Sequence, residues 1–235
     1  MFHKFYRLVW IAGLTGLVAL AGWPYHDGAL RYGLPLSLLA TWSAGLLFCW
    51  RWKFPRIVLL ILPVLAAVPF CLPAKPNDPA KLRGNYIAAM GSMEGTRYLW
   101  GGESRWGVDC SGLPRRAIRD ALLEDGWKHA NGGAFREWAR QWWFDTSAKA
   151  LGEGYRGFTR PLEIRGKLCE LDSAPLSRGD LAVTADGRHV MVYFGNGEWI
   201  QADPNSLKVT IGKADPDKNP WFASLVTMHR WTLLN

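Results

Sequence analysis

The stretch YLWGGESRWGVDCSG, from Tyr98 to Gly112, holds the most informative chemistry in this chain. Cys110 stands there between an aspartate and a serine, shortly after a Gly-Gly and a Trp-Gly pair. Glycines on both sides permit a sharp turn and a close approach of another molecule. An apolar helical pattern follows directly, and its early Pro114 suits the first turn of a helix. The stretch therefore predicts a thiol presented on a turn where a helix begins.

A thiol in that place has the properties of a nucleophile. The partial positive charge of a helix N-terminus lowers the pKa of a thiol. The unpaired N–H groups of the first turn can also hold an oxyanion. The alternative is a disulfide between Cys110 and Cys169, which an oxidising exterior permits. A domain of this size builds a sufficient core without one, so the surroundings of Cys110 favour the nucleophile.

A nucleophilic thiol needs a base, and His189 is the best candidate among five histidines. It opens a predicted strand, which is a rigid support, directly after the turn 185–188. The next predicted strand, beyond an Asn-Gly hairpin signal, carries Gln201 as its lone polar residue. A side-chain amide can hold one ring nitrogen of His189 and leave the other facing the thiol. The other four histidines lie in less suggestive surroundings: His3, His26, His129 and His229.

The order of the predicted elements indicates an α+β fold. Helical spacing predicts a helix over Lys81–Met93 and another that begins at Cys110 or Ser111. Alternating or continuous apolar runs then predict a series of antiparallel strands: Leu181–Thr184, His189–Phe194, Glu198–Ala202, Leu207–Ile211 and Ser224–Trp231.

Several linked motifs together resemble the NlpC family of papain-like cell-wall peptidases. The segments that match, in the family's order, are Tyr98–Gly102, Asp109–Gly112, Arg178–Leu181, His189–Gly197 and Ile200–Ala202. The resemblance covers roughly 81–211 and implies a papain-like NlpC fold. It implies that Cys110 is the nucleophile, His189 the base and Gln201 the orienting residue. It also implies that Tyr98 lines the site near the thiol, with Asp109 and Ser111 as contacts for the substrate or the oxyanion.

The chain departs from the family pattern in two places. The third residue of the family's triad is often histidine, whereas Gln201 can form a hydrogen bond but cannot titrate. The interval from Cys110 to His189 is also long, because it holds a Trp-rich insert at about 126–165. Helical spacing of the aromatic residues in this insert fits core packing or, alternatively, a wall or lid over a cleft.

The first third of the chain, 1–73, predicts a membrane region. Three apolar stretches occur there, each near the lower limit of about 17 residues for a span: Leu8–Gly22, Leu34–Trp50 and Ile57–Leu72. Positive charges flank the N-terminus and fill the loop 51–56, so the positive-inside rule places both in the cytoplasm. Three spans then leave the rest of the chain outside the membrane.

Residues 1–21 alternatively read as a cleaved signal peptide, with a basic start, an apolar stretch and Ala19-Leu-Ala21. Two spans would remain in that case, and the second part of the chain would still lie outside. A Pro-rich linker at 74–80 separates the membrane region from the predicted peptidase domain at 81–235.

Charge and motifs exclude several other classes of protein. The net charge of +8 is concentrated in the membrane region, and the remainder has no basic run, so nucleic acid is not an expected partner. The chain has no Cys-x-x-Cys and no His-Glu-x-x-His pattern, so neither a zinc ribbon nor a metallopeptidase is expected. No cofactor or metal is needed by a thiol peptidase.

The residues and the resemblance together predict a thiol protease, a hydrolase anchored in the cytoplasmic membrane with its domain on the periplasmic or extracellular side. Its expected partners are membrane lipid and the stem peptides of peptidoglycan, and its expected target is the bond between D-glutamate and the diamino acid. Two alternatives stay open: a papain-like amidase or acyltransferase, and a non-enzymatic membrane protein that binds the cell wall.

Overall fold

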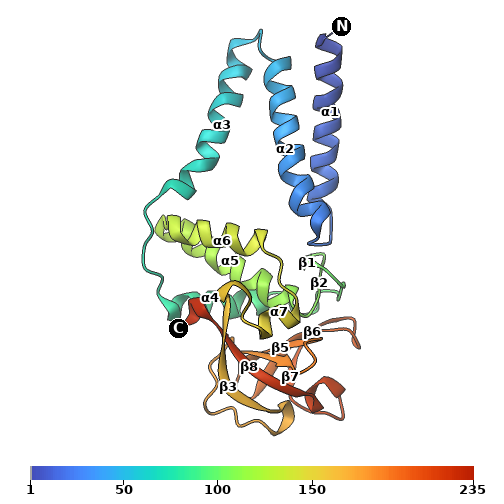
Figure 1. Cartoon of the computed structure of the whole chain (residues 1–235), viewed down its shortest axis with the longest axis vertical. Helices are drawn as coiled ribbons and strands as arrows, with labels where there is room; N and C mark the ends of the chain where they lie inside the picture. Colours follow the sequence, from blue (N-terminus) through green and yellow to red (C-terminus); the bar gives the residue numbers. More distant parts are fainter. Residues whose placement is uncertain (1) are drawn as a thin grey trace. The chain divides into compact units, whose positions relative to one another are not determined.

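The computed structural model describes residues 2–235, which form two compact units, Met1–Pro73 and Ala74–Asn235 (Figure 1). The first unit consists of three helices: α1 (Phe2–Ala21), α2 (Gly28–Phe48) and α3 (Lys53–Cys71). All three are long and apolar enough to cross a membrane. Asp27 begins α2 by accepting a hydrogen bond from the Leu30 N–H at 3.0 Å. Helices α1 and α2 approach closely, since a Cβ at Gly45 would lie 2.8 Å from the Trp10 ring.

The second unit begins with helix α4 (Pro79–Gly91). Asp78 caps it by accepting a hydrogen bond from the Lys81 N–H at 3.3 Å. Pro79 occupies the first helical position, where its missing N–H costs nothing. This Asp-Pro start explains why the helix begins two residues before the predicted Lys81.

Helix α5 (Gly112–His129) is the central helix of the second unit, and it packs against α4. Its start agrees with the sequence prediction. Its apolar side chains are fully buried: Leu113, Ala117, Ile118, Ala121 and Leu122. Two shorter helices follow, α6 (Gly132–Trp143) and α7 (Ala148–Gly152). Before α5, the Gly-rich stretch forms a two-stranded sheet of β1 (Glu103–Ser104) and β2 (Gly107–Val108).

The main sheet has six antiparallel strands. Their spatial order is β3 (Thr159–Lys167), β8 (Leu225–Trp231), β4 (Leu181–Thr184), β5 (Val190–Gly195), β6 (Glu198–Asp203) and β7 (Lys208–Lys213). Alternate residues of the central strands supply two separate cores. Val190 and Val192 pack with α4 and α5, whereas Met191 and Tyr193 belong to a second cluster on the other face. The predicted α+β fold is confirmed.

The Trp-rich region is more regular than the sequence indicated. Helix α5 continues through its beginning, and the edge strand β3, which was not predicted, occupies its end. In between, Phe135 is buried, and Trp138 and Phe144 pack against the first core. These three aromatic side chains serve as core, whereas Trp127 and Trp143 are 70% and 41% exposed, so core packing accounts for part of the region only.

A buried ion pair joins the loop before β4 to strand β8. Arg230 donates from Nε to Asp180 Oδ1 at 2.6 Å and from Nη2 to Oδ2 at 2.7 Å. The Asp180 side chain is fully buried, and the Ser177 N–H also donates to it. We expect Arg230→Leu to lower the free energy of unfolding by about 3–5 kcal/mol, because it leaves a buried carboxylate without its cation.

This expectation can be checked by urea unfolding of the full chain in detergent, followed by near-ultraviolet circular dichroism. Lys128→Leu is the matched control, because it removes the cation of the exposed pair between Lys128 and Glu124. Exposed pairs contribute roughly 0–1 kcal/mol. Equal losses in both variants would show that burial does not strengthen the pair between Arg230 and Asp180.

Candidate active site

Cys110 lies on the turn directly before α5, where backbone segments meet at very short range. The Asp109 N–H donates to the Gly102 carbonyl at 3.0 Å. A Cβ at Gly112 would lie only 2.2 Å from the same carbonyl oxygen. Glycine at position 112 is therefore a steric requirement of the turn that presents Cys110.

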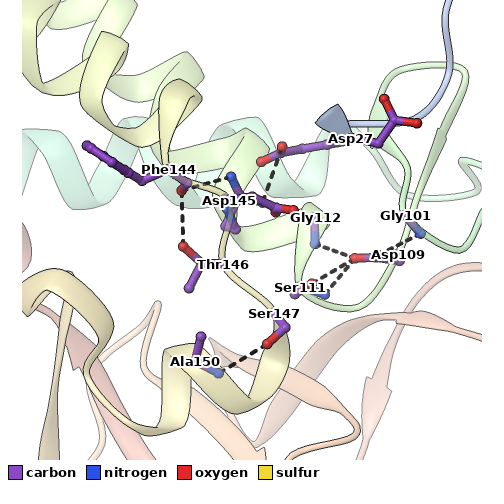
Figure 2. A network of polar contacts seen from close by, with 12 residues as sticks. Asp27, Gly101, Asp109, Ser111, Gly112, Phe144, Asp145, Thr146, Ser147 and Ala150 are labelled. Carbon is purple, nitrogen blue, oxygen red and sulfur yellow. Dashed lines mark hydrogen bonds and ion pairs between the residues drawn. The ribbon is translucent and has the colours of Figure 1, made fainter. Parts of the chain in front are cut away.

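The Asp109 carboxylate holds this turn together, as Figure 2 shows. Its Oδ1 accepts hydrogen bonds from the Ser111 N–H and Oγ, both at 3.0 Å, and from the Gly112 N–H at 2.6 Å. Its Oδ2 accepts from the Gly101 N–H at 2.8 Å. Two N–H groups of the helix start are thus already used by Asp109, although the sequence suggested that they serve the thiolate or an oxyanion.

The thiol of Cys110 is buried beside the start of β5. Its Sγ lies 3.7 Å from the carbonyl oxygen of Arg188, and the Val190 N–H is near enough to favour the thiolate. These two residues flank His189 in the chain. Burial raises the pKa of the Cys110 thiol to about 12, and the negative charge of Asp109 adds to the shift. The sequence predicted the opposite direction, because a helix N-terminus alone lowers the pKa of a thiol.

His189 is fixed by its backbone and by its ring. Its N–H donates to Thr184 Oγ1, and its carbonyl accepts from the Thr184 N–H, both at 3.0 Å. Its Nε2 lies 2.6 Å from Gln201 Oε1, and both side chains are only 1% exposed. An amide oxygen accepts only, so Nε2 carries the proton and donates. The other ring nitrogen, Nδ1, is then the basic one.

Burial lowers the pKa of His189 to about 4. The hydrogen bond with Gln201 and the negative charges of Asp203 and Asp186 act in the opposite direction. Burial therefore disfavours both the imidazolium form of His189 and the thiolate form of Cys110, and so works against an ion pair between them before a substrate arrives.

Tyr98 lies near the thiol, as the resemblance implied. Its N–H donates to the Leu207 carbonyl at 2.8 Å, which fixes its backbone. Burial raises the pKa of the Tyr98 hydroxyl to about 12, and the negative charges of a Cys110 thiolate, formed at high pH, and of Asp109 contribute to the shift. The structure thus places all six predicted residues in one region: Tyr98, Asp109, Cys110, Ser111, His189 and Gln201.

Trp221 and Asn219 also belong to this region and were missed by the sequence. The Trp221 indole stacks on the His189 ring, with ring centroids 4.3 Å apart and an angle of 16° between the planes. Asn219 forms a hydrogen bond with Asp203, two residues after Gln201. The Asn-Pro pair at 219–220 indicates a tight turn, but nothing in the sequence shows which ring Trp221 meets.

Arg115 and Arg119 form a buried ionic cluster on α5, one turn and two turns beyond the nucleophile's turn. Their Nη1 atoms lie 3.4 Å and 3.3 Å from Glu103 Oε2 in β1. Arg115 also pairs with Asp145 at 2.5 Å and donates to the Phe144 carbonyl at 3.4 Å. This cluster connects α5 to β1 and to the segment that follows α6. Figure 2 shows that segment, including Asp145.

The remaining candidates from the sequence have local partners. His129 pairs with Asp125 at 2.9 Å, and His229 Nε2 lies 2.9 Å from Thr227 Oγ1. All four cysteines are free, so Cys110 and Cys169 do not form a disulfide. Within residues 2–235, no group of three or more His, Cys, Asp or Glu side chains is arranged to hold a metal ion.

Residues 95–230, more than half of the chain, match the sequence model of the NlpC/P60 family. The chain belongs to the NlpC/P60 family. Domains of this family are typically cysteine peptidases that act on peptidoglycan. A search of curated proteins gives no match.

Solved structures similar to this chain have low identity. NlpC1 from Trichomonas vaginalis is 20% identical with a TM-score of 0.43, and the alignment covers 66% of this chain but only 45% of NlpC1. The peptidoglycan hydrolase RipB from Mycobacterium tuberculosis is 21% identical with a TM-score of 0.41, covering 86% and 89% of the two chains. The P60 domain of an antigen from M. avium subspecies paratuberculosis is 22% identical with a TM-score of 0.38, covering 63% and 95%. The family assignment therefore rests on the sequence match.

The raised pKa of Cys110 predicts how its alkylation depends on pH. Thiolate is the reactive form, and below the pKa its fraction rises about tenfold per pH unit. In a variant with Cys49, Cys71 and Cys169 replaced by alanine, we expect the iodoacetamide rate at Cys110 to rise in this way from pH 6 to 9. Mass spectrometry of the alkylated full chain measures the rate. A plateau between pH 5 and 8 would contradict the neutral pair, because a thiolate–imidazolium ion pair gives such a plateau.

Proposed function

We propose that this protein is a membrane-anchored cysteine endopeptidase that hydrolyses peptide bonds in the stem peptides of peptidoglycan. The observation that carries the proposal is the buried hydrogen bond of 2.6 Å between His189 and Gln201 beside the thiol of Cys110. This arrangement contains a nucleophile, a base and a group that orients the base. Membership in the NlpC/P60 family supports the substrate class.

The first chemical step joins the Cys110 sulfur to the carbonyl carbon of the scissile bond. Because the thiol and the imidazole are both neutral, the thiol proton passes to His189 Nδ1 as the sulfur attacks. The carbonyl oxygen becomes an oxyanion. Since Asp109 uses the N–H groups of Ser111 and Gly112, the N–H groups of Val190 and Cys110 are the proposed backbone donors beside the sulfur.

The second step breaks the carbon–nitrogen bond. His189 returns its proton to the leaving amine, and the acyl group stays on the sulfur as a thioester. A water molecule then attacks the thioester carbonyl carbon, and His189 Nδ1 takes a proton from this water. The carbon–sulfur bond breaks, and His189 returns the proton to the sulfur of Cys110. Gln201 keeps the other ring nitrogen, Nε2, protonated throughout, so Nδ1 faces the reaction in every step.

Two further residues, Tyr98 and Ser111, are proposed to contact the substrate. Tyr98 presents a neutral hydroxyl. Ser111 Oγ donates its proton to Asp109, so its lone pairs remain available to accept a hydrogen bond from the substrate.

The bond between D-glutamate and the diamino acid is the proposed target, which the family resemblance supports. Arginines 115 and 116 are less suited to binding carboxylates of the stem, because each is already paired with an aspartate.

The proposed location is the cytoplasmic membrane, with the second unit on the periplasmic or extracellular side. The three apolar helices and the positive charges at the N-terminus and in the loop 51–56 support this topology. The topology also brings the proposed enzyme to the side of the membrane where peptidoglycan lies.

We expect the full chain in nanodiscs to release new fragments from purified stem peptides, and Cys110→Ala to release none. Gln201→Ala should lower kcat by about 10²-fold, because a misplaced base costs a factor of this order. Mass spectrometry of the fragments provides the rates and names the bond.

His229→Gln is the matched control, since it changes a second buried histidine that is paired with Thr227. It should retain activity. Cleavage by Cys110→Ala, or full activity of Gln201→Ala, would contradict the proposed roles. A wild-type chain that transfers an acyl group but releases no hydrolysed fragment would instead support an acyltransferase.

A further inference from the structure

Trp221 covers one face of the His189 ring, and this contact was not implied by any motif. The two rings are nearly parallel, with an angle of 16° and a centroid separation of 4.3 Å. The imidazole edge meets Gln201 at the same time. A ring held at one face and at one edge has little freedom to turn about its χ2 angle.

The backbone around Trp221 is built to hold this position. Asn219 Oδ1 accepts a hydrogen bond from the Trp221 N–H at 3.0 Å and thereby begins a short 3-10 helix, Pro220–Ala223. The Asn219 side chain also binds Asp203. The next residue, Phe222, is buried in the second core. Strand β6 thus anchors both Gln201 and, through Asp203, the turn that carries Trp221.

The indole nitrogen does not fix the ring. Trp221 Nε1 is buried and has no hydrogen-bond partner within residues 2–235. The position of the ring therefore depends on its backbone and on packing of its aromatic face, and a phenylalanine at this place keeps most of that face.

We propose that Trp221 is a positioning residue for His189: its ring fixes the plane of the imidazole and keeps water away from the hydrogen bond with Gln201. Water would otherwise compete for Gln201 Oε1 and for His189 Nε2, and the base would lose its fixed tautomer. The contact with Trp221 matters more because Gln201 is neutral. An amide holds an imidazole or imidazolium ring by a weaker hydrogen bond than a charged partner does.

Burial by the indole also bears on the protonation of His189. The negative charges of Asp203 and Asp186 favour the imidazolium, whereas the Cys110 thiol adds no charge while it is protonated. Burial outweighs the two aspartates and lowers the pKa of His189 to about 4. Removal of the indole admits water, which solvates the imidazolium. The pKa of His189 should then rise towards its ordinary value.

The test uses the full chain in nanodiscs with ¹³C-labelled histidine and follows the His189 ring resonance, assigned with His189→Asn. In Trp221→Ala we expect the pKa of His189 to rise by about one unit or more. Trp221→Phe should stay near the wild type. Trp199→Phe is the control, because Trp199 belongs to the same core but contacts the Tyr193 ring instead, at an angle of 59°. It should leave the titration of His189 unchanged.

Kinetics on stem peptides add a second readout, which rests on the proposed function. Trp221→Ala should lower kcat by about tenfold or more with KM changed by less than about threefold, since the chemical step and not binding is affected. A His189 titration that is the same in Trp221→Ala and wild type would overturn the positioning role. A shifted titration in a chain that cleaves nothing would support the positioning role and refute the hydrolase.

Discussion

The Asp109 carboxylate is the constraint on which the site depends. It joins the Gly-rich loop at Gly101 to the first N–H groups of α5, and Cys110 lies between these two attachments. The close contact between Gly102 and Gly112 is possible because Gly112 has no side chain. An anion beside a nucleophilic thiol has a cost, because its charge raises the pKa of Cys110 further after burial has raised it. Asp109 therefore fixes the geometry of the turn but lowers the fraction of Cys110 that is present as thiolate.

With a neutral thiol, the orientation of the base becomes more important. A thiolate needs only to be positioned, whereas a thiol must give up its proton during the attack, so the direction of His189 Nδ1 matters throughout the step. Antiparallel pairing of β5 and β6 provides that direction. Val192 pairs with Ile200, so His189 and Gln201 are diagonal neighbours on one face of the sheet. The spacing between them in the chain is thus a consequence of a short hairpin and its register.

The sequence predicted the elements whose signals are local. The Asp-Cys-Ser turn, the start of α5, the strand that follows His189 and the strand that carries Gln201 depend on residues close together in the chain, and each lies within one or two residues of its predicted place. Strand β3 was missed because it is an edge strand with a proline and several charges, and the inward positions of its alternating run, Leu162, Ile164 and Gly166, are only half-buried. The direction of the pKa shift of Cys110 was wrong for a related reason. A helix start is visible in sequence, but the burial that outweighs it depends on β5 and the glycine loop.

Two features of the site depend on residues that are far apart in the chain, so no local sequence pattern predicts them. They are the stack of Trp221 on His189 and the ionic cluster around Arg115. Arg115 follows Cys110 by little more than one turn, and its buried guanidinium binds the buried Glu103 and the exposed Asp145. Removing one partner of such a buried cluster leaves a charge without compensation, so the cluster resists movement of the helix. Asp145 lies two residues beyond the end of the Trp-rich helix α6, which packs Trp138 against the first core. The Trp-rich region therefore acts on the site through structure: it supplies a fixed carboxylate that holds the helix on which Cys110 is presented.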